Sequence, residues 1–154
     1  MSEILSGLFF INDVDVWKEY GVFLTESKEG GRDNQAAIMT ASKTKGHTAV
    51  NIREENGEKY SKKLTVSNEA RDVILLFALY NPTRAGWLKK YRAFISFLKT
   101  GRDGWLTFRF PQLDLELKVF YKESSNFKPL TWLFKEGVQA SSFKVKFREP
   151  EPAF

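Results

Sequence analysis

The sequence predicts a mainly β (α+β) fold: an antiparallel β-sandwich or split barrel with one flanking amphipathic helix at about residues 83–99 and a long mobile loop at about residues 27–46. Short apolar or alternating segments, bounded by turn residues, recur along the chain, and one segment keeps apolar residues at helical spacing. The 154 residues, 42% hydrophobic and 15% aromatic, are enough to build one core. We therefore expect a single domain over residues 1–154, with a proline-rich C-terminal tail at 148–154.

The N-terminal region predicts two short strands around a helical turn. Residues 8–11 form an apolar run, and the following Asn12-Asp13 pair favours a turn or a helix cap. In residues 14–20 the apolar side chains fall three and four positions apart, which is typical of a helix. Gly21 is placed to end that helix in a left-handed conformation, and residues 22–25 resume as strand.

The predicted loop at residues 27–46 is rich in glycine and in small polar or charged side chains. A connection of this length without secondary structure is uncommon in a compact domain and is usually functional or disordered when unbound. Ile38 and Met39 interrupt its polar composition. We therefore predict that these two residues are an apolar anchor for a subunit or partner contact.

The next segments predict a polar hairpin and a buried strand. Residues 48–53 and 60–66 are β-prone, and the Asn56-Gly57 pair between them favours a hairpin turn. Residues 72–80 are apolar after the first position and stop at Asn81-Pro82. This continuous run predicts the central strand, buried on both faces.

The main helix is predicted at residues 83–98 by a stripe of apolar side chains at helical spacing, namely Trp87, Leu88, Tyr91, Phe94, Ile95 and Leu98. Asn81 fits the cap position and Pro82 the first helical position. Gly101 fits the position that ends the helix.

The C-terminal third predicts further antiparallel strands. Residues 105–110 and 115–121 alternate apolar with polar side chains across a short turn, as expected for a hairpin with one wet face. Residues 130–134 and 143–147 predict two more strands. The tail at 148–154 cannot continue a sheet because its prolines lack backbone donors.

The sequence offers no constellation for catalysis, for a metal or for a cofactor. Cysteine is absent, and His47, the one histidine, stands in a polar stretch without a neighbouring base. Asp13, Asp15 and Glu19 lack the remaining ligands of a calcium loop. We therefore expect a protein that is not an enzyme, without cofactor, metal or small-molecule substrate, and without a membrane partner because no window is long and apolar enough.

The predicted helix carries a basic face opposite its apolar stripe, formed by Arg84, Lys89, Lys90, Arg92 and Lys99, and the formal net charge of the chain is +5. We predict Arg84, Lys89, Lys90 and Arg92 as residues of a polar subunit or partner contact. A solvated helix face and a basic nucleic-acid-binding module are the alternatives.

Several segments, in this order, resemble the bacteriophage distal tail proteins and their tail-tube-like relatives, which are siphophage-type tail hub components. The matching stretches cover most of the chain: residues 10–24 (FINDVDVWKEYGVFL), 87–94 (WLKKYRAF), 104–108 (GWLTF), 120–127 (FYKESSNF) and 143–147 (FKVKF). The resemblance implies a tail-tube-like β domain flanked by a helix.

The resemblance also implies a function. Relatives are virion structural proteins that close into homo-oligomeric rings, commonly hexameric, around the channel through which DNA passes. It implies that the chain belongs to a phage or prophage tail made in the bacterial cytoplasm, with itself and neighbouring tail proteins as partners and DNA only as passing cargo. Tube-like relatives reach a neighbouring subunit with an extended loop, and residues 27–46 match that loop by position and character.

Overall fold

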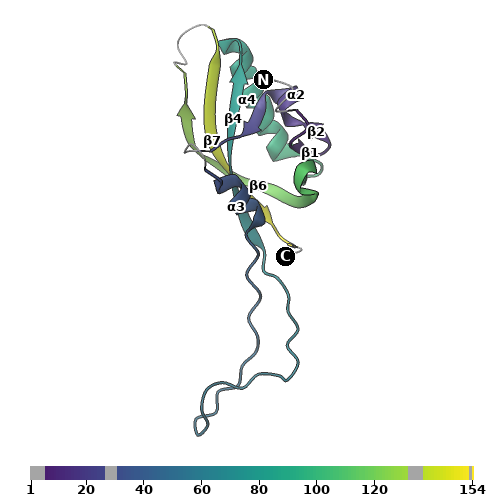
Figure 1. The fold of residues 1–154 in the computed structure, drawn as a ribbon, viewed down its shortest axis with the longest axis vertical. Helices are drawn as coiled ribbons and strands as arrows, with labels where there is room; N and C mark the ends of the chain where they lie inside the picture. The colour runs from purple at the N-terminus through teal and green to yellow at the C-terminus, as the bar shows by residue number, and fades with distance from the viewer. Residues whose placement is uncertain (1–5, 27–30, 132–136, 153) are drawn as a thin grey trace.

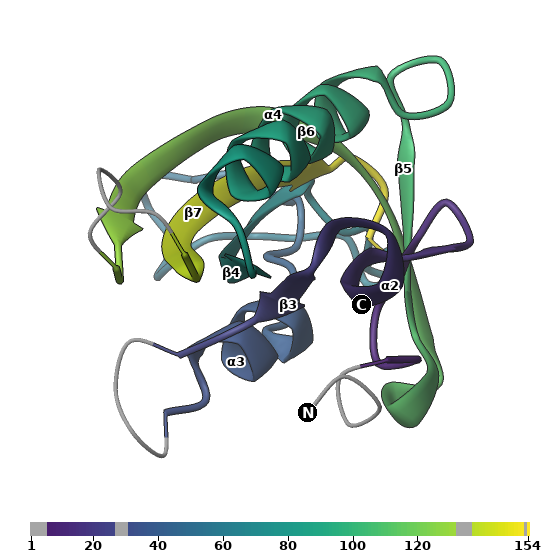
Figure 2. The same cartoon turned by 90° about the horizontal axis from the view of Figure 1, so that it is seen from above.

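The computed structural model describes residues 6–26, 31–131, 137–152 and 154. In these residues seven strands form one antiparallel sheet in the order β2-β1-β5-β6-β7-β4-β3. The strands are β1 (Phe10–Ile11), β2 (Val14–Asp15), β3 (Val22–Leu24), β4 (Arg71–Asn81), β5 (Leu106–Phe110), β6 (Leu115–Pro129) and β7 (Gln139–Glu149). Figure 2 shows the sheet curling from β3 round to β5 into a half-barrel. The mainly β, antiparallel fold class is therefore confirmed.

The curl depends on β6, which changes partner along its length. Residues 115–119 of β6 pair with β5, and from Phe120 onward β6 pairs with β7 through two register shifts. β-Bulges of this kind bend a strand and increase its twist. Beyond Val119, the edge of β6 that faces away from β7 has no strand partner among the described residues.

One main helix, α4 (Arg84–Thr100), packs on this sheet as predicted. Its Trp87, Phe94 and Leu98 are buried in the core, whereas Leu88, which we placed in the same stripe, is exposed. The cap lies two residues later than predicted: Thr83 accepts a hydrogen bond from the Gly86 amide at 3.1 Å.

The three residues predicted to bound α4 differ in how well they match their predicted roles. The Asn81 side chain accepts from the Thr83 amide at 3.0 Å and so supports the true cap from outside. Pro82 precedes the cap rather than standing inside the first turn. Gly101 is the C-cap, as predicted.

The N-terminal segment forms partly as predicted: the first strand covers only residues 10–11, and residues 14–15, which we placed in the helix, form the short strand β2 instead. The short helix α2 (Val16–Tyr20) is capped by the Asp15 carboxylate, which accepts from the Trp17 amide at 3.1 Å. Gly21 ends α2 with φ +69°. Asn12 and Asp13, both at positive φ, form the turn between β1 and β2.

Gly21→Ala is expected to lower the free energy of unfolding by about 2–3 kcal/mol. The left-handed backbone disfavours any Cβ, and a Cβ here would lie only 2.5 Å from the Tyr80 carbonyl oxygen on β4. Gly104→Ala is the matched control, because φ is +86° there but a Cβ would meet no atom within 4 Å. Urea unfolding followed by tryptophan fluorescence measures both, and equal losses in the two variants would contradict the steric part of this account.

The predicted loop at about 27–46 is wrong in its extent, because helix α3 (Asp33–Met39) lies inside it. Two carboxylate bonds hold the start of α3: the Asp33 and Asn34 amides donate to Glu26 at 2.9 and 3.1 Å. The Asn34 side chain then bonds both backbone groups of Leu76 on β4. Asn34 and Leu76 are 42 residues apart, so no local sequence pattern predicts this contact. Residues 27–30 of the predicted loop lie outside the described residues.

The extended segment is instead formed by residues 41–70, which we call the arm. Figure 1 shows the arm leaving the body beside α3 and the C-terminus and pointing away from it. The predicted strands at 48–53 and 60–66 are wrong as strands: only an isolated bridge, Val50 to Lys59, joins them, with amide–carbonyl bonds of 2.8 and 2.7 Å. Gly57, at φ +70°, lies in the predicted turn between them.

Two further strand predictions need correction or cannot be placed. β4 lies next to the edge strand β3 rather than at the centre of the sheet, and its Ile74 and Tyr80 are exposed. It is continuously buried only over residues 77–79, where β3 pairs with it along its edge. The predicted strand at 130–134 falls mostly on residues 132–136, outside the described part of the chain. The predicted strand at 143–147 lies within β7. The predicted start of the tail is wrong, because residues 148 and 149 continue β7 and pair with β4; the sheet stops only where Pro150 follows.

Candidate interaction surfaces

The base of the arm is fixed to the body by a buried ion pair. Arg71 Nε contacts Glu149 Oε1 at 2.5 Å, and the two side chains are only 9% and 6% exposed. The same guanidinium donates to the Thr40 carbonyl and lies 5.0 Å from the centre of the Phe154 ring. The C-terminal tail therefore helps to set the direction in which the arm leaves the body.

Backbone bonds reinforce this base. The Ser42 amide donates to the Phe154 carbonyl at 3.0 Å, and the Asn68 side chain donates to the Pro152 carbonyl at 3.2 Å. An isolated bridge joins Thr44 to Asn68 just beyond. The first residues of both legs of the arm are thus held, while the rest projects into solvent.

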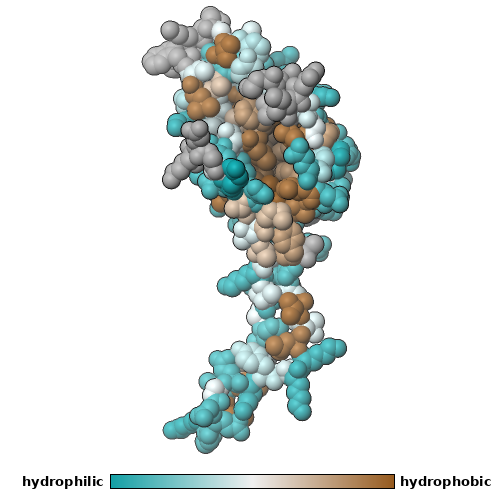
Figure 3. Space-filling model, in the orientation of Figure 1, coloured by the Kyte–Doolittle hydropathy of each residue, from teal (hydrophilic) through white to brown (hydrophobic). Residues whose placement is uncertain are grey.

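The projecting part of the arm exposes apolar side chains that do not belong to the core cluster, namely Val50, Ile52, Tyr60, Leu64 and Val66. Figure 3 shows hydrophobic patches along an otherwise hydrophilic arm. Exposed apolar side chains gathered on one projecting segment are a feature of protein contact surfaces. His47 also lies here, with its ring edge-on to Tyr60 at 6.4 Å.

The charges of the arm are divided between its end and its legs. Three carboxylates gather at the end, Glu54, Glu55 and Glu58, beside two cations, Arg53 and Lys59. The legs carry mostly lysine. All three carboxylates are exposed; Lys59 pairs with Glu55 at 3.2 Å, whereas Glu54 and Glu58 make no ion pair with the described residues.

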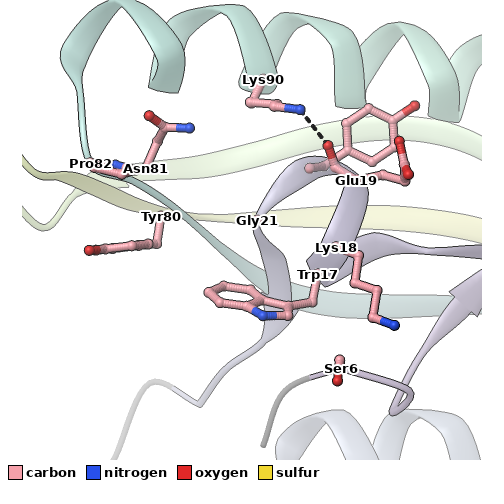
Figure 4. Close-up of a pocket in the computed structure, with 10 residues that line it drawn as sticks. Ser6, Trp17, Lys18, Glu19, Gly21, Tyr80, Asn81, Pro82 and Lys90 are labelled. Atoms are coloured by element: carbon pink, nitrogen blue, oxygen red, sulfur yellow. Dashed lines mark hydrogen bonds between the residues drawn. The ribbon is translucent and has the colours of Figure 1, made fainter. Parts of the chain in front are cut away.

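The cations of the predicted basic face of α4 differ in their surroundings. Lys89 and Arg92 are exposed, and so is Arg84. Lys90 instead donates to the Glu19 carbonyl at 2.6 Å, so its ammonium joins α4 to the end of α2 within one subunit, as Figure 4 shows. The hollow of about 440 Å³ beside it is floored by the stacked rings of Trp17 and Tyr80, 6.4 Å apart.

A second hollow of about 630 Å³ lies between α4 and β6; we call it the α4–β6 groove. Its polar lining comes from Arg92, Ser96, Lys99 and Thr100 on α4 and from Tyr121 and Ser124 on β6, and no carboxylate lines it. Lys99 Nζ lies 5.6 Å above the Tyr121 ring, and the Tyr121 and Ser124 hydroxyls are 2.8 Å apart. Two cations and several hydroxyls facing one hollow suit an anionic partner.

Tyr91 closes the inner side of this groove. Burial, together with the nearby Tyr121, raises the pKa of the Tyr91 phenol above its ordinary value, so the ring is neutral at physiological pH. Its ring is stacked on Trp87 and edge-on to Phe143. The groove therefore has a rigid aromatic wall and a charged rim.

The predicted interface residues are placed very differently from one another. Ile38 is only 2% exposed and belongs to the core, so within one subunit it is not the apolar anchor of a loop, whereas its neighbour Met39 is 49% exposed at the end of α3. Arg92 lines the α4–β6 groove. Sequence reasoning missed the half of the groove that β6 supplies, because the meeting of α4 with β6 is a tertiary contact.

The described residues contain neither a metal-binding cluster nor a helix that could span a membrane. Across residues 6–26, 31–131 and 137–152, no group of three or more His, Asp or Glu side chains is placed to hold a metal ion. Within the same part of the chain, every helix is too short or too polar to cross a bilayer.

The fold is similar to that of the Dit protein (gp 19.1) of phage SPP1, whose crystal structure is described as a paradigm of the hub adsorption apparatus in phages that infect Gram-positive bacteria. The TM-score is 0.58 at 10% sequence identity, over 92% of this chain and 49% of that one. This chain therefore spans about half the length of that neighbour. No protein-family model matches the chain, and no curated protein matches it in sequence.

Proposed function

We propose that this chain is a structural component of a phage or prophage tail: a ring-forming distal tail, hub or adaptor protein that surrounds the DNA channel. The single observation that carries the proposal is the likeness of its curled sheet to a phage hub protein over 92% of the chain. In this role it is one tail-tube-like domain of the virion tail, made in the bacterial cytoplasm. It has no catalytic task.

The partners of such a component are copies of itself, in a ring that is commonly hexameric, and the neighbouring tail proteins. The arm supports this, because its exposed apolar side chains have no core to join within one subunit. The edge of β6 that has no strand partner among the described residues beyond Val119 supports it too, since closed symmetry covers edges that otherwise invite uncontrolled pairing. DNA is then passing cargo rather than a bound ligand.

Removal of the arm is expected to abolish self-association while leaving the body folded. In the variant, a two-residue Asn-Gly turn replaces residues 45–67 and joins Thr44 directly to Asn68, which already pair. We expect the dissociation constant for self-association to rise about a hundredfold or more, since the apolar anchors are removed. Light scattering across a concentration series measures the mass, and a melting temperature unchanged within a few degrees shows that the body is intact.

The control is Gly46→Ala in one leg of the arm, which keeps every apolar and charged side chain, has no left-handed backbone to strain and meets no atom within 4 Å. It should associate as the original chain does. A variant without the arm that still forms a closed ring mass would contradict the role assigned to the arm. An intact chain that stays monomeric at all concentrations and with neighbouring tail proteins present would contradict the proposed function.

A basic nucleic-acid-binding module is the second candidate, favoured by the cations of the α4–β6 groove and by the exposed Lys89 nearby. This candidate predicts affinity for DNA that falls steeply with salt and with Lys89→Ala and Arg92→Ala. The absence of binding to double- and single-stranded DNA at low salt would remove it.

A further inference from the structure

The α4–β6 groove combines a cationic rim with an open strand edge. Arg92 and Lys99 stand along its α4 side, and no carboxylate lines it. On its other side, β6 continues past Val119 with β7 on one edge only, and its residues 122–129 are exposed. Unpaired backbone groups on such an edge accept an added extended chain. An occupant of this groove should therefore be extended and acidic.

The end of the arm meets the charge requirement, and the legs on either side of its turn at residues 53–57 are extended. Its backbone is extended outside the turn, with the single bridge between Val50 and Lys59. Its Glu54 and Glu58 side chains are exposed, and Glu58 stays an acceptor, bonded by the Tyr60 hydroxyl at 2.6 Å. The exposed Ile52 beside these carboxylates adds an apolar contact for the aromatic wall of the groove.

The arm is also long enough to reach another subunit. From Thr40 to Glu54 an extended chain spans up to about 45 Å. A compact body of about 120 residues has a radius of gyration of about 14 Å. The end of the arm therefore reaches well across the body of an adjacent copy, whereas its base is fixed so that it points away from its own body.

We propose that the acidic end of the arm of one subunit, through Glu54 and Glu58, docks in the α4–β6 groove of the next subunit against Arg92 and Lys99. This deepens the proposed function and rests on it, because it requires copies of the chain to meet. The contact is head-to-tail, since the arm and the groove are different surfaces. Repeated around an axis, such a contact produces a closed ring when the rotation closes.

A charge exchange tests the contact in the full chain. Arg92→Glu with Lys99→Glu puts like charges across the contact, and so does Glu54→Lys with Glu58→Lys. Each pair of changes is expected to weaken self-association about tenfold or more. The variant that carries all four changes restores opposite charges and should recover the dissociation constant to within about threefold of the original. Sedimentation velocity across a concentration series at low salt measures all four proteins.

Lys18→Glu is the control, because Lys18 is an exposed cation on α2 that does not line the groove. It should leave self-association unchanged. Circular dichroism and thermal melts check that each variant is folded, which matters because Lys99 also covers the Tyr121 ring.

Three results would overturn the docking. Variants that associate as the original chain does would refute it while leaving the proposed function standing. If the variant with all four changes associates as weakly as the two double variants, the groove and the end of the arm do not contact each other. If Arg92→Glu with Lys99→Glu weakens DNA binding and leaves self-association unchanged, the groove is a nucleic-acid site instead.

Discussion

Truncation of Phe77 to alanine is expected to lower the free energy of unfolding by about 3–5 kcal/mol, the largest loss that any single side chain of the core should produce. Phe77 on β4 is fully buried. Its ring meets four other phenylalanines at centroid distances of 5.6–6.2 Å, namely Phe9, Phe94, Phe143 and Phe147. Those partners come from the N-terminal segment, from α4 and from β7, so a cavity at Phe77 removes packing contacts from all three elements.

The measurement is urea unfolding followed by tryptophan fluorescence. Domains of this size are stable by only about 5–15 kcal/mol, so Phe77→Ala itself can leave too little folded protein to measure. Phe77→Leu is therefore made in parallel, with an expected loss of about 1–2 kcal/mol. Phe127→Ala is the control: its ring is 43% exposed and makes edge-on ring contacts with Trp87 and Tyr91. A loss at Phe77→Ala no larger than at Phe127→Ala would contradict the central position of Phe77.

Glu149→Gln is expected to cost about 3 kcal/mol, the second largest effect. The change leaves the Arg71 guanidinium charged and buried without its carboxylate, and one partner removed from a buried pair typically costs about 3–5 kcal/mol. We expect the lower end of that range because Arg71 keeps its bond to the Thr40 carbonyl and its contact with the Phe154 ring. The base of the arm should loosen together with the pair.

Two measurements separate the global from the local effect. Thermal unfolding reports the whole domain, and hydrogen exchange at the Ser42 and Glu69 amides, which donate to Phe154 and Lys43, reports the base of the arm. The double change Arg71→Met with Glu149→Leu removes both charges and should return to within about 1 kcal/mol of the original stability. If Glu149→Gln is as stable as the original chain, or if the double change is as damaging as the single one, the buried charge is not what matters at this position.

Elements whose signals are local were predictable from sequence. The stripe of α4 and Gly101 at its end are decided within one helix, because side chains three and four apart share a face and glycine alone enters the required turn cheaply. The alternation in β5 placed Leu106, Phe108 and Phe110 inward as expected. The resemblance to phage distal tail proteins, drawn from segments in order, agrees with the fold similarity to a phage hub protein.

The errors occurred where distant partners decide the structure. Residues 33–39 lack a strong helical pattern and become α3 because Asn34 bonds the backbone of Leu76 and Ile38 enters the core. Residues 48–53 and 60–66 have strand propensity, but no sheet lies beside them, so they stay an arm with one bridge. Local propensity therefore missed one helix and predicted two strands that do not form, in both cases because distant contacts decide the structure.

The apolar segments, most of the turns and the long helix beside antiparallel strands follow from local sequence, because they depend on neighbours a few residues apart. The candidate site depends instead on how distant elements pack. Arg92 and Lys99 face Tyr121 and Ser124 because β6 exchanges β5 for β7 and leaves one edge open beside α4. The arm projects because Arg71 and Glu149, 78 residues apart, are buried as a pair at its base. Such long-range burial is a property of the packed chain as a whole, and no local pattern carries it.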